Sequence, residues 1–119
     1  MSLVTLVSGP TSAQREQAIA DRLDPAISTV AILEGFPSGT SVLEEKSSQA
    51  SLKIVRIAAG CMCCTGNLVM RITLNRVLRD STEKIFLSIA DASHLPALRA
   101  FLAAPPYDQL LVLTEDCRM

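Results

Sequence analysis

The chain has few aromatic residues and no excess of charge of either sign. Of its 119 residues only 3% are aromatic and tryptophan is absent, which leaves few rings on which the bases of a single-stranded nucleic acid could stack. It has 11 Lys and Arg against 12 Asp and Glu, so the strongly basic surface that binds nucleic-acid phosphates is missing as well. We therefore expect no nucleic-acid partner.

Long apolar runs are also missing, although 49% of the residues are hydrophobic and the mean hydropathy is +0.33. A membrane-spanning helix needs roughly 20 consecutive apolar residues, and the apolar runs here, such as 29–33 and 110–113, are much shorter. The first eight residues lack the basic start and the long apolar stretch of a signal peptide. We expect a cytoplasmic protein that makes no membrane contact.

Cysteine is present in an unusual distribution. Three of the four cysteines fall within Cys61-Met62-Cys63-Cys64. In a reducing compartment, clustered cysteines are more often metal ligands or redox thiols than structural disulfides. The fourth, Cys117, stands near the end of the sequence, and we expect it to have no role unless the tail folds back.

Short apolar segments alternate with helical patterns along the whole chain. The expected order is strand 3–7, helix 12–23, strand 28–33, strand 52–58, helix 67–79, strand 84–90, helix 93–104 and strand 110–114, with one helical turn near Leu43. Nearly continuous apolar strands between helices are typical of a parallel sheet covered on both faces. The pattern predicts one α/β domain over residues 1–119, with three layers and a mostly parallel sheet of about five strands.

Two of these helices carry more specific expectations. In the helix 67–79, Arg71, Asn75 and Arg79 fall together on a face that we expect to be solvated. The inner apolar face is formed by Met70, Leu74, Val77 and Leu78. In the helix 93–104, Ser93 is expected to be the N-cap.

The loop after the first strand can be compared with a phosphate-binding loop, because ligands of parallel α/β folds bind beyond the carboxyl ends of the strands. Such a loop has the pattern Gly-x-x-x-x-Gly-Lys-[Ser/Thr], in which backbone N–H groups hold phosphates and the hydroxyl holds magnesium. The chain keeps Gly9, but Gln14, Arg15 and Glu16 stand at the last three positions, and Pro10 removes an N–H donor. These changes argue against ordinary nucleoside triphosphate binding.

Two interpretations of this loop remain. The first is a plain strand-to-helix turn that is capped by Thr11 or Ser12. The second is a degenerate anion site made of Gly9, Ser12 and Arg15, in which the helix start and the guanidinium hold a weak anion.

The cysteine cluster lies between a predicted strand and the start of a predicted helix. The positive end of a helix dipole lowers the pKa of nearby thiols and suits them to soft metals. Cys61, Cys63 and Cys64 can present two or three sulfurs to zinc or a similar divalent ion, which leaves a coordination position open. Redox or disulfide chemistry and inert packing are the alternatives.

A further ligand for such an ion would come from elsewhere in the chain or from a second subunit. Glu34, His94 and Cys117 are the candidates within the chain. His94 is the only histidine, and we expect it to be a helix-start residue rather than a ligand.

Taken together, the two loops resemble the N-terminal domain of CobW-type GTPases, which are relatives of the HypB and UreG metallochaperones. The resemblance is carried by Leu6-Val7-Ser8-Gly9 and by Gly60-Cys61-Met62-Cys63-Cys64 running into 68–78, with weaker similarity at 30–34, 85–87 and His94-Leu95. It implies a fold like that of P-loop NTPases and the binding of zinc, cobalt or a similar metal at Cys61, Cys63 and Cys64.

The nucleotide half of the family pattern is altered. Gln14, Arg15 and Glu16 replace the family's Gly, Lys and Thr, Ser88 and Asp91 stand where its Glu-Thr-Ser-Gly segment places Glu and Gly, and Arg56 replaces an acidic residue. The guanine-reading Asn-Lys-x-Asp motif and the C-terminal domain are missing from the sequence.

We therefore expect a shortened relative: a small cytoplasmic, metallochaperone-like protein that binds metal and has lost nucleotide hydrolysis. One alternative is a divergent GTPase or nucleotide-binding protein that uses Arg15 as its phosphate clamp. The other is a homodimeric thiol redox or interaction module.

Overall fold

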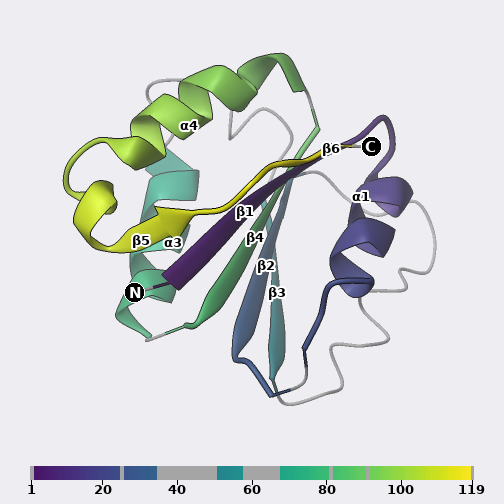
Figure 1. The fold of residues 1–119 in the computed structure, drawn as a ribbon, viewed down its shortest axis with the longest axis horizontal. Coiled ribbons are helices and arrows are strands. Elements are labelled where there is room, and N and C mark those ends of the chain that lie inside the picture. The colour runs from purple at the N-terminus through teal and green to yellow at the C-terminus, as the bar shows by residue number, and fades with distance from the viewer. Residues whose placement is uncertain are drawn as a thin grey trace.

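The computed structural model describes residues 2–24, 26–34, 51–57, 68–80, 82–90 and 92–118. Its elements, in chain order, are β1 (Ser2–Ser8), α1 (Ser12–Ala20), β2 (Thr29–Glu34), β3 (Leu52–Ile57), α3 (Leu68–Arg79), β4 (Lys84–Ile89), a 3₁₀ turn (Ala92–His94), α4 (Leu95–Ala103), a second 3₁₀ turn (Tyr107–Gln109), β5 (Leu111–Leu113) and β6 (Cys117–Arg118) (Figure 1). The helical turn predicted near Leu43 lies outside the described residues.

The strands of the described residues all run parallel in one sheet. Their order is β3-β2-β4-β1-β5, and β6 pairs with the carboxyl half of β1. β1 and β4 pair in register from Leu3 with Lys84 to Ser8 with Ile89, and both strands are almost wholly buried. The predicted α/β fold with a mostly parallel sheet of about five strands is therefore confirmed.

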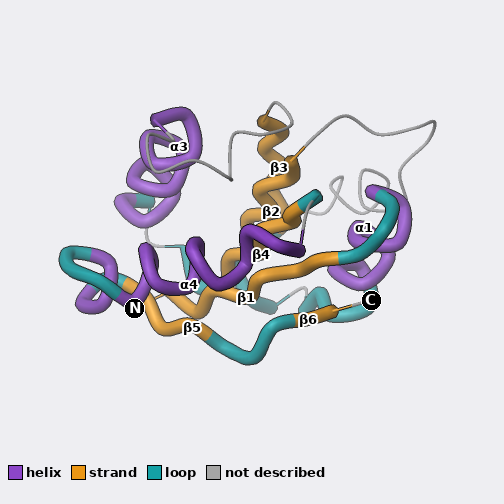
Figure 2. The backbone as a smooth tube through the Cα atoms, turned by 90° about the horizontal axis from the view of Figure 1, so that it is seen from above, coloured by secondary structure: helices purple, strands orange, loops and turns teal. Residues whose placement is uncertain are grey.

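Helices cover both faces of the sheet and make three layers (Figure 2). On one face, Ala18 and Ile19 of α1 pack against the side chains of Leu33 and Phe86. On the other face, α3 and α4 pack against the alternate side chains of the strands, with Leu6, Leu74, Leu87, Leu98 and Leu102 among the buried residues. Burying a large apolar side chain stabilises the fold by about 1.5–3 kcal/mol, so these two clusters hold the layers together.

The handedness of the connections explains which helix lies on which face. Connections between parallel strands are almost always right-handed. From β1 through α1 to β2 the chain moves across the sheet in one direction, whereas from β3 to β4 and from β4 to β5 it moves in the other. Consequently α1 lies on one face, and α3 and α4 lie on the opposite face.

Two helix boundaries differ from the prediction. α1 ends at Ala20 rather than at residue 23, because the following N–H groups of Arg22 and Leu23 bond three residues back and the last turn tightens. Ser93 is not the N-cap of α4, because it lies within a 3₁₀ turn that continues into the helix. His94 takes the cap position, and its side chain does not cap the helix.

The face of α3 that was expected to be solvated has structural contacts as well. Arg71, Asn75 and Arg79 are all exposed. However, the Arg71 guanidinium lies 5.8 Å from the centre of the Phe101 ring, and Asn75 Oδ1 accepts a hydrogen bond of 2.9 Å from the Tyr107 hydroxyl. This row therefore links α3 to the end of α4 and the turn that follows it.

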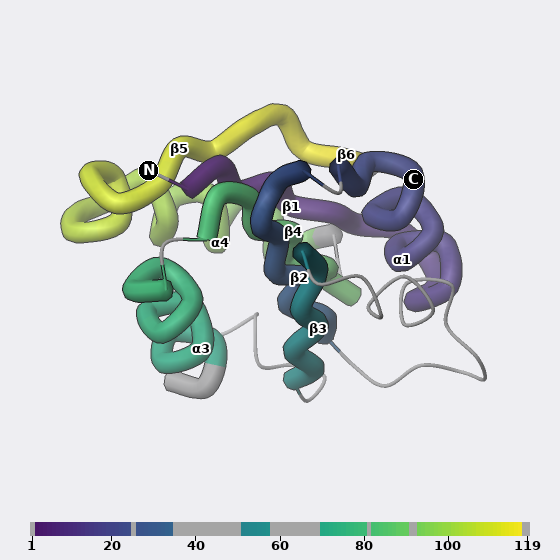
Figure 3. The backbone as a smooth tube through the Cα atoms, turned by 90° about the horizontal axis from the view of Figure 1, so that it is seen from below, coloured from purple at the N-terminus to yellow at the C-terminus, as the bar shows by residue number. Residues whose placement is uncertain are grey.

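The tail of the chain does fold back onto the sheet. Cys117 pairs with Val7 in β6, and its side chain is only 8% exposed among the apolar residues on the α1 face. Figure 3 shows the end of the chain beside α1. Cys117 is thus a buried packing residue rather than an incidental one.

The helices of the described part of the chain are all too short or too polar to cross a membrane.

Candidate functional site at the carboxyl edge of the sheet

The carboxyl ends of the parallel strands meet at one edge of the sheet. β1 ends at Ser8, β2 at Glu34, β3 at Ile57 and β4 at Ile89. In the register of the sheet, Ser8 pairs with Ile89 and Glu34 pairs with Ile57. Ligands of parallel α/β proteins bind at this edge, so the residues that gather here define the candidate site.

The first loop leads from β1 into α1 at this edge. Thr11 is the N-cap of α1, and its hydroxyl accepts a hydrogen bond of 3.1 Å from the backbone N–H of Gln14. Ser12 is the first residue of the helix. The expected turn with a Thr11 cap is therefore confirmed.

Arg15 points inward from the first turn of α1 and is only 4% exposed. Its Nε donates a hydrogen bond of 2.9 Å to Ser88 Oγ on β4, and one terminal nitrogen donates a bond of 2.8 Å to the carbonyl oxygen of Gly9. The guanidinium therefore joins the first loop to the end of β4. Two of the predicted anion-site residues, Gly9 and Arg15, are in contact, and this contact uses N–H donors that a bound anion would need.

Two carboxylates act on the same guanidinium. Burial lowers the pKa of Arg15, and the negative charges of Glu34 and Glu16 oppose this shift. A phosphate loop binds negative charge that the nucleotide brings. Here the chain itself provides negative charge beside its buried cation.

Glu16 forms an ion pair across the same edge. One terminal nitrogen of Arg56, on β3, lies 3.1 Å from Glu16 Oε1, and the two side chains are 16% and 5% exposed. The pair connects α1 to β3 one residue before β3 ends. Glu16 occupies the position at which a phosphate loop has its magnesium-binding hydroxyl, and its carboxylate is instead paired with a cation.

Glu34 completes the arrangement at the end of β2. It is 3% exposed, and its Oε1 accepts a hydrogen bond of 2.8 Å from the backbone N–H of Ala90, just after β4. A buried carboxylate needs such donors, because taking it out of water is otherwise costly. Glu34 therefore holds the ends of β2 and β4 together.

The predicted metal ligands have a different outcome. Cys61, Cys63 and Cys64 lie outside the described residues. Among the residues that are described, no three His, Cys, Asp or Glu side chains form a group that could hold a metal ion. The prediction of a cysteine metal site therefore remains a prediction.

The candidate additional ligands do not come together. Glu34 on β2 and Cys117 on β6 are separated by β4 and β1, which corresponds to about 14 Å at ordinary strand spacing. Their side chains also belong to opposite faces, since Cys117 packs with α1 whereas Glu34 alternates with the residues that do so. Cys117 and Glu34 therefore cannot ligate one ion.

In the sequence, Glu16, Arg56 and Ser88 are separate departures from the CobW-type pattern, and the structure brings all three to one edge. A signal was present in the sequence: the acidic Glu16 stands shortly after the first loop, and the basic Arg56 stands next to the end of the third strand. The bonded partners are 40 and 73 residues apart along the chain, so local sequence pattern could not show that they meet.

The fold and this edge define a small parallel α/β protein. Its first loop is bonded to the side chain of Arg15, which also bonds to the end of β4. Comparison of the chain with models of known families, with curated proteins and with solved structures gives no match.

Proposed function

We propose that this chain is a small metal-binding, metallochaperone-like protein that holds zinc or a similar divalent ion through Cys61, Cys63 and Cys64 and does not hydrolyse a nucleotide. The observation that carries the proposal is the position of the cysteine motif in the chain. Cys61 comes four residues after Ile57, the last residue of β3, which ends at the carboxyl edge. Ligands bind at that edge in folds of this kind.

The contacts of Arg15 and Glu16 support the loss of nucleotide chemistry. A phosphate loop needs free backbone N–H groups, a free cation and a hydroxyl for magnesium. Here Arg15 donates to Ser88 and Gly9, and Glu16 is paired with Arg56. A nucleotide would have to break buried contacts and bring its phosphates close to the carboxylate of Glu16.

The chemistry of the donor set suits a soft or borderline divalent ion. Thiolates bind zinc well, and three of them leave one of four tetrahedral positions open. An open position allows an ion to pass to another protein, which fits a carrier better than a permanent structural site. We propose the reducing cytoplasm as its setting, because there the thiols stay available to the ion.

The sheet favours Glu34 as the residue of the chain that would occupy this open position until the ion passes to another protein. Its Cα pairs with that of Ile57, so it lies beside the strand that leads to the cysteines. Cys117 is four strands away from Ile57, which corresponds to about 19 Å. A Glu34→Gln variant should therefore weaken metal binding, whereas a Cys117→Ser variant should leave it unchanged.

The direct test is the metal content of anaerobically purified protein, measured by elemental mass spectrometry. The wild-type chain and the matched control Cys117→Ser should each retain about one equivalent of metal, as expected of a single site with three thiolates. The triple variant Cys61→Ser, Cys63→Ser and Cys64→Ser should retain none. Equal metal content in the triple variant and the wild type would refute the proposal.

Two further measurements separate the alternatives. Calorimetry with GTP or ATP and magnesium should give no binding, whereas micromolar binding would favour a divergent nucleotide-binding protein. Titration of the thiols with and without reductant should give the same count. A lower count without reductant, together with a dimer in light scattering, would favour the redox or interaction module.

A further inference from the structure

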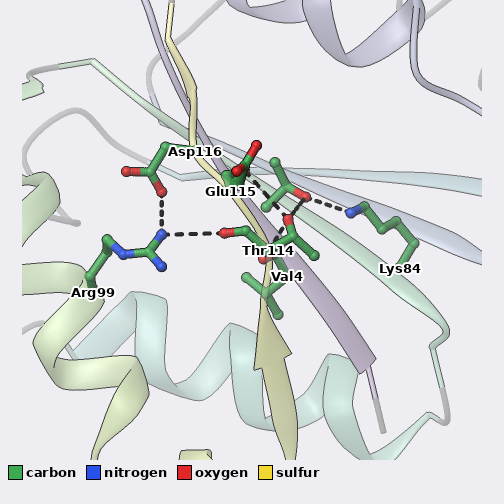
Figure 4. A network of polar contacts seen from close by, with 7 residues as sticks. Val4, Lys84, Arg99, Thr114, Glu115 and Asp116 are labelled. Atoms are coloured by element: carbon green, nitrogen blue, oxygen red, sulfur yellow. Dashed lines mark hydrogen bonds and ion pairs between the residues drawn. The ribbon is translucent and has the colours of Figure 1, made fainter.

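Residues 114–118, called the strap below, lead from the strand that pairs with the start of β1 to the strand that pairs with its carboxyl end. β5 pairs with β1 at Ser2–Val4, and β6 pairs with it again at Val7 and Ser8. Between these two pairings the strap leaves the ladder, and the backbone of Glu115 and Asp116 belongs to neither strand. Figure 4 shows the contacts of this segment.

Thr114 anchors the first end of the strap. Its N–H donates a hydrogen bond of 2.9 Å to the carbonyl oxygen of Val4, and its hydroxyl lies 2.5 Å from that of Thr5. Thr5 in turn accepts a hydrogen bond of 2.5 Å from Nζ of Lys84 on β4. This end of the strap is therefore bonded directly to β1, and Thr5 links it to β4.

The side chain of Arg99, on α4, contacts the middle of the strap. One terminal nitrogen of Arg99 donates a hydrogen bond of 3.3 Å to the carbonyl oxygen of Thr114 and also pairs with the carboxylate of Asp116 (Figure 4). Arg99 is 38% exposed and Asp116 is 10% exposed. Because water reaches the arginine, this ion pair is screened by salt and is weaker than a fully buried one.

The far end of the strap is buried but has a short ladder. β6 consists of Cys117 and Arg118, whereas β4 pairs with β1 over six residues. Cys117 is a free thiol that packs on the α1 face beside Val7. Its pairing partner Val7 comes two residues before Gly9, the residue that accepts a hydrogen bond from Arg15.

We propose that the strap is a conformational device that opens and closes over the carboxyl end of β1, with the Arg99–Asp116 pair as its latch. When it is closed, β6 extends the sheet and Cys117 is buried. When it is open, the rest of the sheet stays folded, while the edge of β1 at Val7 and Ser8 is uncovered next to the first loop. Segments held by few buried contacts open at lower free energy than the global unfolding of the fold. This proposal does not depend on metal binding.

The thiol of Cys117 reports the opening. The full-length protein is pulse-labelled with N-ethylmaleimide under native conditions and digested with trypsin, and the label is measured by mass spectrometry. The fragment 100–118, or 85–118 where Arg99 is replaced, contains Cys117 as its only cysteine. Labelling of the other three cysteines therefore does not interfere.

Arg99→Ala and Asp116→Asn should each raise the labelling rate of Cys117 by about 2- to 5-fold, because the latch contributes a modest share of the closing free energy. Arg76→Ala, which removes an exposed arginine from α3, is the matched control and should leave the rate unchanged. Added salt should speed the labelling of the wild type but not that of the two latch variants.

Hydrogen exchange at the amide of Leu87, in the centre of the sheet, distinguishes strap opening from global unfolding. The proposal requires that Arg99→Ala speeds labelling at Cys117 by a larger factor than exchange at Leu87. Equal factors at the two sites would overturn it, as would equal labelling rates in Arg99→Ala and Arg76→Ala. A wild-type rate equal to that of the chain in denaturant would also overturn it.

Discussion

Two arginines on helices perform similar tasks in very different surroundings. Arg15 of α1 is 4% exposed and holds the first loop against β4. Arg99 of α4 is 38% exposed and holds the strap against the outer edge of β1. Each makes contact with a backbone carbonyl and lies close to carboxylate charge.

The difference in burial gives the two arginines different roles. Arg15 belongs to the framework, that is, to the contacts on which the fold depends, whereas Arg99 is part of the latch. A buried charge that loses its partner leaves an uncompensated charge away from water, which costs several kcal/mol. An exposed pair is screened, and its loss costs little. The contacts of Arg15 are therefore part of the fold itself, whereas those of Arg99 can open and close.

The largest effect is expected for Arg15→Ala. This variant removes the donor to the Ser88 hydroxyl and the Gly9 carbonyl, and it removes a buried cation whose charge interacts with those of Glu34 and Glu16. We expect the free energy of unfolding, measured with urea, to fall by about 3–5 kcal/mol. The control Arg76→Ala, at an exposed position, should change it by less than about 0.5 kcal/mol. A similar loss of unfolding free energy in Arg15→Ala and Arg76→Ala would contradict the assignment of Arg15 to the framework.

A double-mutant cycle on Glu16 and Arg56 should give the next largest effect. Because both partners are largely buried, Glu16→Gln and Arg56→Gln should show a coupling energy of about 1–3 kcal/mol in urea unfolding. This coupling should change little in high salt, since buried pairs are weakly screened. A coupling near zero would mean that the pair contributes nothing to the framework.

The same cycle on Arg99 and Asp116 should give a smaller value. We expect a coupling of about 0.5–1 kcal/mol at low ionic strength and its near disappearance in about 1 M salt, because the arginine is partly exposed. A coupling that equals that of Glu16 and Arg56, or one that persists in salt, would contradict the assignment of this pair as a latch.

The smallest effect concerns pH and Lys84. Burial lowers the pKa of Lys84, so the folded chain holds this proton less tightly than the unfolded chain. The resulting penalty is complete below the folded pKa and disappears as pH rises to the unfolded pKa. Relative to Lys84→Met, the wild type should therefore gain stability between neutral pH and the ordinary lysine range. Parallel curves of unfolding free energy against pH for the two proteins would disprove this.

The layers of the fold were predictable because their signal is local. Val4, Leu6 and Ile85 belong to short apolar runs between helical patterns, and such runs are typical of a buried parallel sheet. The turn at Thr11 was also predictable, since a threonine before a helix is a common N-cap. Both inferences need only residues that are close in the sequence.

The tail and the side-chain contacts of the site could not be predicted in the same way. A strand of two residues, such as that containing Cys117, has no period that a sequence can show. The inward direction of Arg15 depends on Ser88, which is 73 residues away, and an arginine at a helix start is otherwise expected at the surface. These features follow from the tertiary pairing of strands rather than from local pattern.

The central proposal is that the chain binds metal through Cys61, Cys63 and Cys64 and does not hydrolyse a nucleotide. Its most direct test is the zinc affinity of the reduced chain, measured by competition with a chromophoric chelator in the presence and absence of GTP and magnesium. We predict a single tight site that GTP does not change and that disappears in the triple variant Cys61→Ser, Cys63→Ser and Cys64→Ser. Unchanged zinc affinity in that variant would contradict the account.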